Sequence, residues 1–438
     1  MKKLNDEYRD LPKNRKWDRP HEPDPVNTGG GNEMEYDNVE YSKVSEKISK
    51  TPWNREHWII FIAISTSFFM WGITLAIAPL ITTWYFVPQF SYYYIIGAAP
   101  AGLLSGNMAM GYISDRLGRK NIFLLTIGIT VLGLLGIGIS YNYIYLIIFV
   151  FIAEFGLGGD ETLSLAIMVE YLPLKNRGFA IIESSNLANI GITLIAGLFL
   201  VFTSSVIIQK MWLITIAILS GIISIIARYH MEESGLWILG TKIGTNNKIT
   251  AGNAIKFLAL SFMGIAIIVG FAFSDLVLGP FHFPQYTGVI IFFSVLAESV
   301  FGVLGGYYMG KSSRKTLAMV GFTGMLASWV IAVIFLNTII SNLFYLLAIL
   351  AISSIFGEIA WGSRELLEPE NFISKYRGRG IGSVRSVGYA LYIVIIFILI
   401  NAGIETYAFF ILIVYLAGFV GSSLYMLYGR ETKSMKIR

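Results

Sequence analysis

The 438-residue chain contains no cysteine. It therefore has no disulfide framework, no thiolate metal site and no cysteine nucleophile. Charge is also scarce, because 14% of the residues are charged while 55% are hydrophobic and the mean hydropathy is +0.64. A water-soluble enzyme needs more surface charge than this, so the composition argues against that class.

Signatures of nucleotide and metal binding in a suitable context are missing as well. The sequence has no His-x-x-x-His spacing, and its match to GxxxxGK[ST] at 305–312 ends a long apolar run, whereas a phosphate-binding loop of this kind follows a strand. We therefore expect no ATP-driven step, no metal and no cofactor. The pI near 9 does not indicate nucleic acid, because the basic residues follow a membrane pattern described below.

The charges that are present gather at the start of the chain. Residues 1–56 hold 11 of the 33 Lys and Arg and 12 of the 28 Asp and Glu, together with a run of three glycines. Such a segment buries too little apolar surface to fold alone. We predict that 1–56 is a disordered cytoplasmic tail.

Long apolar runs follow this tail. From Trp58 onward, runs of about 20 residues, enough to cross a hydrocarbon core of ~30 Å as a helix, alternate with short polar breaks. Twelve runs are present, at residues 58–86, 91–112, 120–140, 144–170, 178–203, 210–230, 254–278, 286–309, 316–337, 343–364, 379–401 and 406–428. The sequence predicts an all-α integral membrane protein with twelve transmembrane helices.

Basic residues set the orientation of these helices. If the runs alternate in direction, 21 Lys and Arg after residue 56 fall on one side and Lys210 alone falls on the other. Cytoplasmic loops are the basic ones, so we predict a plasma membrane protein with both termini in the cytoplasm.

The two halves of the sequence repeat each other. The segment 111–120, after the second run, is matched by 306–315 after the eighth, 195 residues later. Glu170 and Glu365 stand the same distance apart after the fourth and tenth runs. This repeat predicts two pseudo-symmetric six-helix bundles around a central path. The predicted domains are the bundle 57–230, the cytoplasmic linker 231–253, the bundle 254–429 and the C-terminal tail 430–438.

The loop GYISDRLGRK at 111–120 resembles the signature between the second and third helices of the major facilitator superfamily, and the resemblance extends over all twelve runs. It implies that Asp115 meets a helix N-terminus and nearby bases across the bundle interface, as a cytoplasmic latch. The Asp is replaced by Gly310 in the second copy, which predicts a weaker latch there. The expected gating residues are Gly111, Asp115, Arg116, Arg119, Glu170 and Arg177.

Further motifs point to branches of that family. The segment 158–178 resembles the fourth-helix pattern of phosphate, niacin-type and organic-ion symporters that use protons. Glu233-Ser234 and Glu431-Thr432-Lys433 are similar to motifs of sugar porters.

Acidic residues inside the predicted helices are candidate proton carriers, because an ionisable group in a membrane is costly. Asp160 is the first candidate, at a depth of about 16 Å from the basic side by helical rise. Glu161, Glu154 and Asp275 follow, the last just before Gly279-Pro280, where the helix should break. The alternative is that each acid forms a permanent pair that fixes helix packing.

Other intramembrane residues are candidates for contacting a substrate. Arg385 resembles the anion-contacting Arg of organic-ion transporters, although it has the alternative of pairing with Glu358. The predicted substrate residues are Arg385, Asn189, Asn186, Trp361 and Glu298.

These observations predict a secondary transporter that works by alternating access and is not an enzyme. We expect a monomer that moves a small organic anion in symport with protons. Three alternatives stay open, namely a sugar or polyol porter, a uniporter, and a transporter-like receptor that binds without translocating. A membrane-embedded enzyme would also suit clustered acids, but the repeat and the latch argue against it.

Overall fold

The computed structural model describes residues 41–229, 231, 233–242, 251–399 and 401–433. Within these residues every regular element is a helix. Eleven helices are long and apolar enough to cross a membrane. The twelfth is α4 (Tyr92–Leu117), a 26-residue helix that contains several glycines and polar residues. The predicted fold of twelve transmembrane helices is confirmed.

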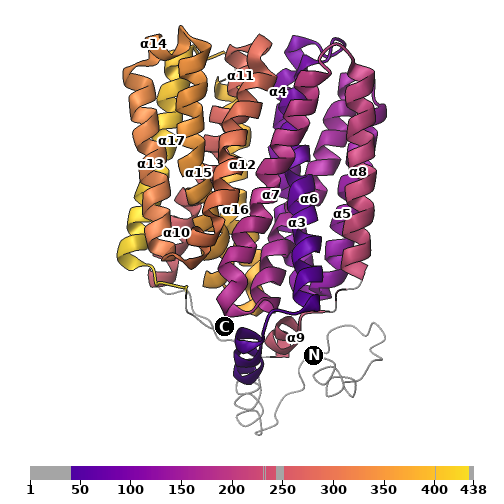
Figure 1. The fold of residues 1–438 in the computed structure, drawn as a ribbon, viewed down its shortest axis with the longest axis vertical. Helices are drawn as coiled ribbons and strands as arrows, with labels where there is room; N and C mark the ends of the chain where they lie inside the picture. Colours follow the sequence, from indigo (N-terminus) through magenta and orange to yellow (C-terminus); the bar gives the residue numbers. More distant parts are fainter. Residues whose placement is uncertain (1–40, 230, 232, 243–250, 400, 434–438) are drawn as a thin grey trace, which may run out of the picture.

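The helices form two bundles that stand side by side in Figure 1. The N-terminal bundle consists of α3 (Arg55–Leu80), α4, α5 (Arg119–Ile139), α6 (Tyr143–Tyr171), α7 (Leu174–Val201) and α8 (Val206–Tyr229). The C-terminal bundle consists of α10 (Ala251–Ile265), α12 (Thr287–Lys311), α13 (Arg314–Ile334), α15 (Leu343–Asn371), α16 (Arg377–Leu399) and α17 (Ile404–Tyr428). The shorter helices include α9 (Gly235–Lys242), α11 (Leu278–His282) and α14 (Leu336–Ile340).

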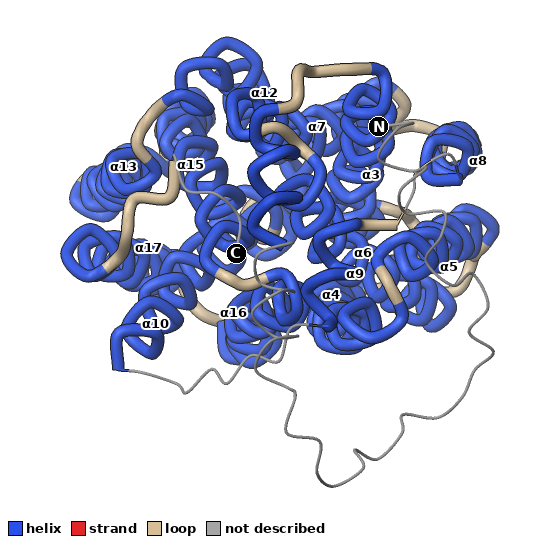
Figure 2. The backbone as a smooth tube through the Cα atoms, turned by 90° about the horizontal axis from the view of Figure 1, so that it is seen from below, coloured by secondary structure: helices blue, strands red, loops and turns tan. Residues whose placement is uncertain are grey.

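Two helix pairs join the bundles. α4 packs against α16, and α7 packs against α12, while α5 and α8 lie at one flank and α13 and α17 at the opposite flank (Figure 2). The interface between the bundles is therefore lined by α3, α4, α6 and α7 on one side and by α12, α15, α16 and the seventh transmembrane helix on the other.

The seventh transmembrane helix is irregular. α10 continues into π-helical turns at Ala266–Gly270 and Ala272–Leu276, and the chain resumes as α11. Asp275 lies in the second π turn, directly before the break that the sequence predicted near Gly279-Pro280. Such turns inside a helix commonly mark functional sites.

Most basic loop residues lie at one end of the molecule, which is called the basic end below. It carries the loops after α4, α6, α12 and α15 and the short helix α9, at the bottom of Figure 1. Three residues that the sequence counted with these loops, Arg228, Arg364 and Arg385, are instead fully buried within helices.

The segment before α3 differs from the predicted disordered tail. The chain is helical over 41–50, and α3 begins at Arg55 with Asn54 as its N-terminal cap. Tyr41, Val44 and Ile48 share one face of the helix over 41–50 and pack against the protein core. This apolar spacing is the signal that a highly charged composition concealed. Residues 1–40 lie outside the described part of the chain.

Close helix packing depends on glycine at Gly72 of α3. A Cβ atom there would lie 1.8 Å from the carbonyl oxygen of Ala188 on α7. We expect Gly72→Ala to push α3 and α7 apart and to destabilise the protein by about 1–3 kcal/mol, measured as a lower melting temperature in detergent.

The matched control is Gly128→Ala on α5, where a Cβ atom would have no neighbour within 4 Å. Ala favours a helix over Gly by about 0.5–1 kcal/mol, so this variant should melt no lower than the wild type. Equal melting temperatures for the two variants would contradict the packing assigned to Gly72.

Candidate functional site

A network of buried ion pairs closes the interface at the basic end. Asp115, at the end of α4, accepts hydrogen bonds from the backbone N–H groups of Gly378 (3.2 Å) and Arg379 (2.9 Å) at the start of α16. Its side chain also pairs with Arg119 at 2.6 Å. A carboxylate at a helix N-terminus is favoured by the helix dipole. These are the contacts that the resemblance implies for Asp115, and they join the two bundles.

Glu170 extends this network from the end of α6. It pairs with Arg377 of the C-terminal bundle at 2.6 Å and accepts a hydrogen bond from the Ser374 hydroxyl at 2.7 Å. Arg119 reaches both groups, lying 3.4 Å from Glu170 and donating to the Ser374 carbonyl at 3.0 Å. Because all of these groups are buried, separating the bundles here would leave charges without partners.

Backbone contacts support the same closure. A Cβ atom on Gly111 would lie 2.8 Å from the carbonyl oxygen of Gly378, so Gly111 permits the approach of α4 to α16. The corresponding contact in the other half brings Gly310 of α12 against Gly178 of α7, again with no room for a side chain. The Gly that replaces Asp in the second copy thus has a packing function in place of a charge.

Two expected gating residues lie outside the network. Arg116 is exposed and stacks over Tyr112 at 4.1 Å. Arg177 is buried, but none of its guanidinium nitrogens has a hydrogen-bond partner among the described residues. The gating roles of all six residues stay predictions.

The motifs similar to sugar porters cap helices beside the network. Glu233 accepts from the backbone N–H of Arg119 (2.9 Å) at the start of α5, and Glu431 accepts from that of Arg314 (3.2 Å) at the start of α13. Burial raises the pKa of Glu233 despite these N–H groups. For Glu431 burial is outweighed by the Ser313 hydroxyl and backbone N–H groups, which hold its pKa below the usual value.

Asp160 is enclosed within the N-terminal bundle. It pairs with Arg228 of α8 at 2.5 Å and accepts from Thr126 of α5 at 3.1 Å and from Ser67 of α3. Arg228 also stacks over Phe123 at 3.4 Å. This arrangement matches the alternative given above for Asp160, in which the acid forms a permanent pair that fixes helix packing. Arg228 was missed because it stands at the end of an apolar run, where a base normally marks a loop.

Arg385 lies in a second buried cluster, called the Arg385 cluster, which spans the bundle interface. It pairs with Glu161 of α6 and with Glu365 (2.7 Å) and Glu368 (2.6 Å) of α15. Arg364 completes the cluster at 2.9 Å from Glu365. The five side chains are all 0% exposed, and they contain three carboxylates and two guanidinium groups.

The predicted pair of Arg385 with Glu358 is absent. The reason is the length of α15, which the sequence ended at residue 364 but which continues to Asn371. Glu365 and Glu368 therefore lie inside the helix and face Arg385. Glu358 instead accepts a hydrogen bond from Asn189 of α7 at 2.8 Å, and Asn186 donates to the Ser299 carbonyl at 3.1 Å.

Acidic residues without basic partners occupy the C-terminal side of the interface. Asp275 accepts from Ser274 and from Ser354 (3.0 Å), and it lines a small cavity together with Glu298 and Trp361. Glu298 and Glu358 are both buried. On the N-terminal side, Glu154 of α6 is buried and neither carboxylate oxygen has a hydrogen-bond partner among the described residues.

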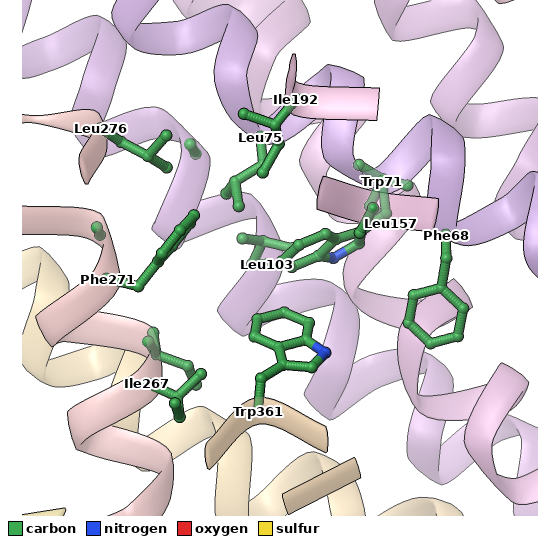
Figure 3. Close-up of a cluster of buried hydrophobic side chains, with 14 of the residues drawn as sticks. Phe68, Trp71, Leu75, Leu103, Leu157, Ile192, Ile267, Phe271, Leu276 and Trp361 are labelled. Atoms are coloured by element: carbon green, nitrogen blue, oxygen red, sulfur yellow. The ribbon is translucent and has the colours of Figure 1, made fainter. Parts of the chain in front are cut away.

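Two tryptophans meet at the centre of the interface. Trp71 of α3 and Trp361 of α15 contact edge to face, with ring centroids 5.2 Å apart, and Leu103, Leu75 and Phe271 surround them (Figure 3). Both indole N–H groups are buried, and neither has a hydrogen-bond partner among the described residues. An aromatic centre with unused donors, flanked by carboxylates, is suited to hold a small polar molecule.

Comparison with known proteins agrees with this architecture. The sequence pattern of the Major Facilitator Superfamily matches residues 60–237. The solved structure of the proton:xylose symporter XylE of E. coli, bound to 6-bromo-6-deoxy-D-glucose, superposes with a TM-score of 0.70 at 15% identity, over 87% of this chain and 97% of that one. The chain is thus similar in sequence to the Major Facilitator Superfamily over residues 60–237 and has the same fold as XylE.

The curated relatives include a sugar transporter and a phosphate transporter. Glucose transporter GlcP of Staphylococcus epidermidis is 24% identical over 341 residues, which cover 66% of this chain and 74% of the relative. Low affinity inorganic phosphate transporter 4 of Petunia hybrida is 35% identical over 118 residues, 26% of this chain. That match spans 22% of the length of the phosphate transporter.

The network at the basic end makes a prediction about accessibility. Asp115→Asn removes a charge that both Arg119 and the start of α16 require, so we expect the basic end to open more often. Ser363 is fully buried on α15, so Ser363→Cys gives this cysteine-free protein a single reporter of access. The new thiol should react several-fold faster with a maleimide when Asp115→Asn is also present than when it is absent. Arg116→Gln is the control, since this neighbouring charge lies outside the network, and it should leave the rate unchanged. Equal rates in the two backgrounds would refute the closure assigned to Asp115.

The pair of Asp160 and Arg228 makes a prediction about stability. Asp160→Asn leaves the buried guanidinium without its charge partner, which typically costs about 3–5 kcal/mol. We expect a markedly lower melting temperature for D160N and partial recovery in the double variant D160N/R228Q. If D160N melts like the wild type but abolishes uphill uptake, Asp160 is a proton carrier and not a structural partner.

Proposed function

We propose that the protein is a secondary transporter that moves a small polar metabolite by alternating access, coupled to protons. The observation that carries this proposal is the bundle interface itself. It is closed at one end by ion pairs whose members come from different bundles, and it encloses carboxylates, amides and a tryptophan pair nearer its centre. Rocking of one bundle against the other would exchange access to this region.

The basic residues support an orientation for this cycle. Because cytoplasmic loops carry the excess of Lys and Arg, the basic end faces the cytoplasm of a plasma membrane protein. The described structure then represents a state closed toward the cytoplasm.

The substrate that the geometry supports best is a hydroxylated metabolite such as a sugar or polyol. Hydroxyl groups can donate to the carboxylates and accept from the indole N–H groups, while the rings of Trp71 and Trp361 offer apolar faces to carbon. The similarity to the glucose transporter and to the proton:xylose symporter supports the same class.

An organic anion is the second candidate, and Arg385 favours it. In the described state three carboxylates surround this Arg, so an anion would compete with them. Protonation of Glu161 would weaken one of these pairs and free donors of Arg385. The same step would loosen a link between the bundles, which gives Glu161 a means of coupling protons to movement.

The proposal keeps three further proton carriers, Asp160, Glu154 and Asp275, which differ in whether they have a basic partner. Asp160 must first leave Arg228, whereas Glu154 and Asp275 have no basic partner to leave among the described residues.

Counterflow in proteoliposomes tests the function. Vesicles loaded with unlabelled glucose, xylose or mannitol should take up the labelled form of at least one of them without an energy source, whereas succinate and phosphate should not exchange. Exchange of succinate alone would select the organic anion. Binding in a thermal-shift assay without exchange of any compound would identify a receptor and refute transport.

A further inference from the structure

Four carboxylates form a row that passes from α7 through the C-terminal bundle. Asp275 and Glu298 line the same cavity, and Glu298 interacts electrostatically with both Asp275 and Glu358. Glu358 interacts in the same way with Glu183 of α7. This set, Asp275, Glu298, Glu358 and Glu183, is called the acidic row.

The acidic row runs along the membrane normal. Asp275 lies in the π turn of the seventh helix, at the level of Ser354, with which it hydrogen-bonds. Glu358 is one helical turn, about 6 Å, beyond Ser354 toward the basic end. Glu183 faces Gly306, two turns or about 12 Å beyond Glu298 on α12. The row therefore connects the half of the membrane opposite the basic end with the half near it.

No base among the described residues pairs with a member of the acidic row. Within the described residues none of its four members forms an ion pair, while Asp275, Glu298 and Glu358 are each at most 3% exposed. The other titratable groups that interact with the row are Glu365, Tyr407 and Tyr415. An unpaired buried carboxylate costs several kcal/mol in its charged form, and uptake of a proton removes that cost.

Unused polar groups and a small cavity accompany the row. In the part of the chain that the structure describes, one oxygen each of Glu298 and Glu358 has no hydrogen-bond partner. The buried N–H of Trp361 on the cavity wall has none either. The cavity is barely large enough for one water molecule and also presents the hydroxyls of Ser353, Ser354 and Tyr415. In the described closed state such a space suits water and protons.

We propose that the acidic row is the proton path of the transporter, with Glu298 and Glu358 as its central proton-binding pair. The inference rests on the proposed function, since it explains how protons cross. A proton enters at one end as H⁺ and leaves at the other, and between them only O–H bonds of carboxyls and water form and break. The amide of Asn189 on the other bundle donates to Glu358, so the charge on this carboxylate is sensed across the interface.

The test measures proton binding without any substrate. Wild-type protein in lipid on a solid-supported membrane should give a transient current when the pH is stepped. We expect Glu298→Gln and Glu358→Gln to lose most of this current, because Gln keeps the volume and cannot take up a proton. Infrared difference spectra of the same pH step should show a carboxyl band in the wild type that is lost in both variants. Glu405→Gln, an exposed acid at the start of α17, is the control and should keep both signals.

The outcomes are distinct. A wild type that gives neither current nor carboxyl band refutes the proton path, and so do variants that keep both signals while D160N loses them. The assay is independent of the substrate, so the acidic row can fail while counterflow succeeds, and the reverse also holds. Folding of each Gln variant is checked by its elution profile, and either variant alone is sufficient for the comparison.

Discussion

Buried ion pairs between the two bundles are the constraint on which the rest of the structure depends. The Asp115 carboxylate accepts hydrogen bonds at the start of α16, and Glu170 pairs with Arg377. These partners stabilise charges that have no access to water. A charge in such a place is stable only with its partner present, so the contact is either made in full or broken and rehydrated. This property favours two discrete arrangements over a continuum, which alternating access requires.

Contacts between the bundles near the centre of the interface also depend on buried carboxylates and their partners. Glu161 reaches Arg385 across the interface, and Asn189 reaches Glu358. Both contacts change when a carboxylate gains a proton, whereas the pairs at the basic end combine fixed charges from several residues. The structure thus places carboxylates that could exchange protons at the centre and the ion pairs that join the bundles at the basic end.

The twelve helices and the contacts of Asp115 could be predicted from sequence, because apolar length and a local motif specify them. The partner of Asp160 could not, since Arg228 becomes its neighbour only when α8 packs against the rest of the bundle. The partners of Arg385 were missed for a different reason. The predicted run stopped at a charged residue, but α15 continues past it, and charges inside a helix are tolerated when an opposite charge on another helix faces them.

The helix over 41–50 is tethered close to the network at the basic end. Tyr41 of this helix is buried close to Glu170 and Arg377, which belong to different bundles. Residues 51–54 tether the helix to α3 and span at most about 14 Å when extended. A detached helix therefore stays at a high effective concentration near its binding surface. Rebinding is then a fast intramolecular event whose rate depends on tether length and not on the amount of protein in the membrane.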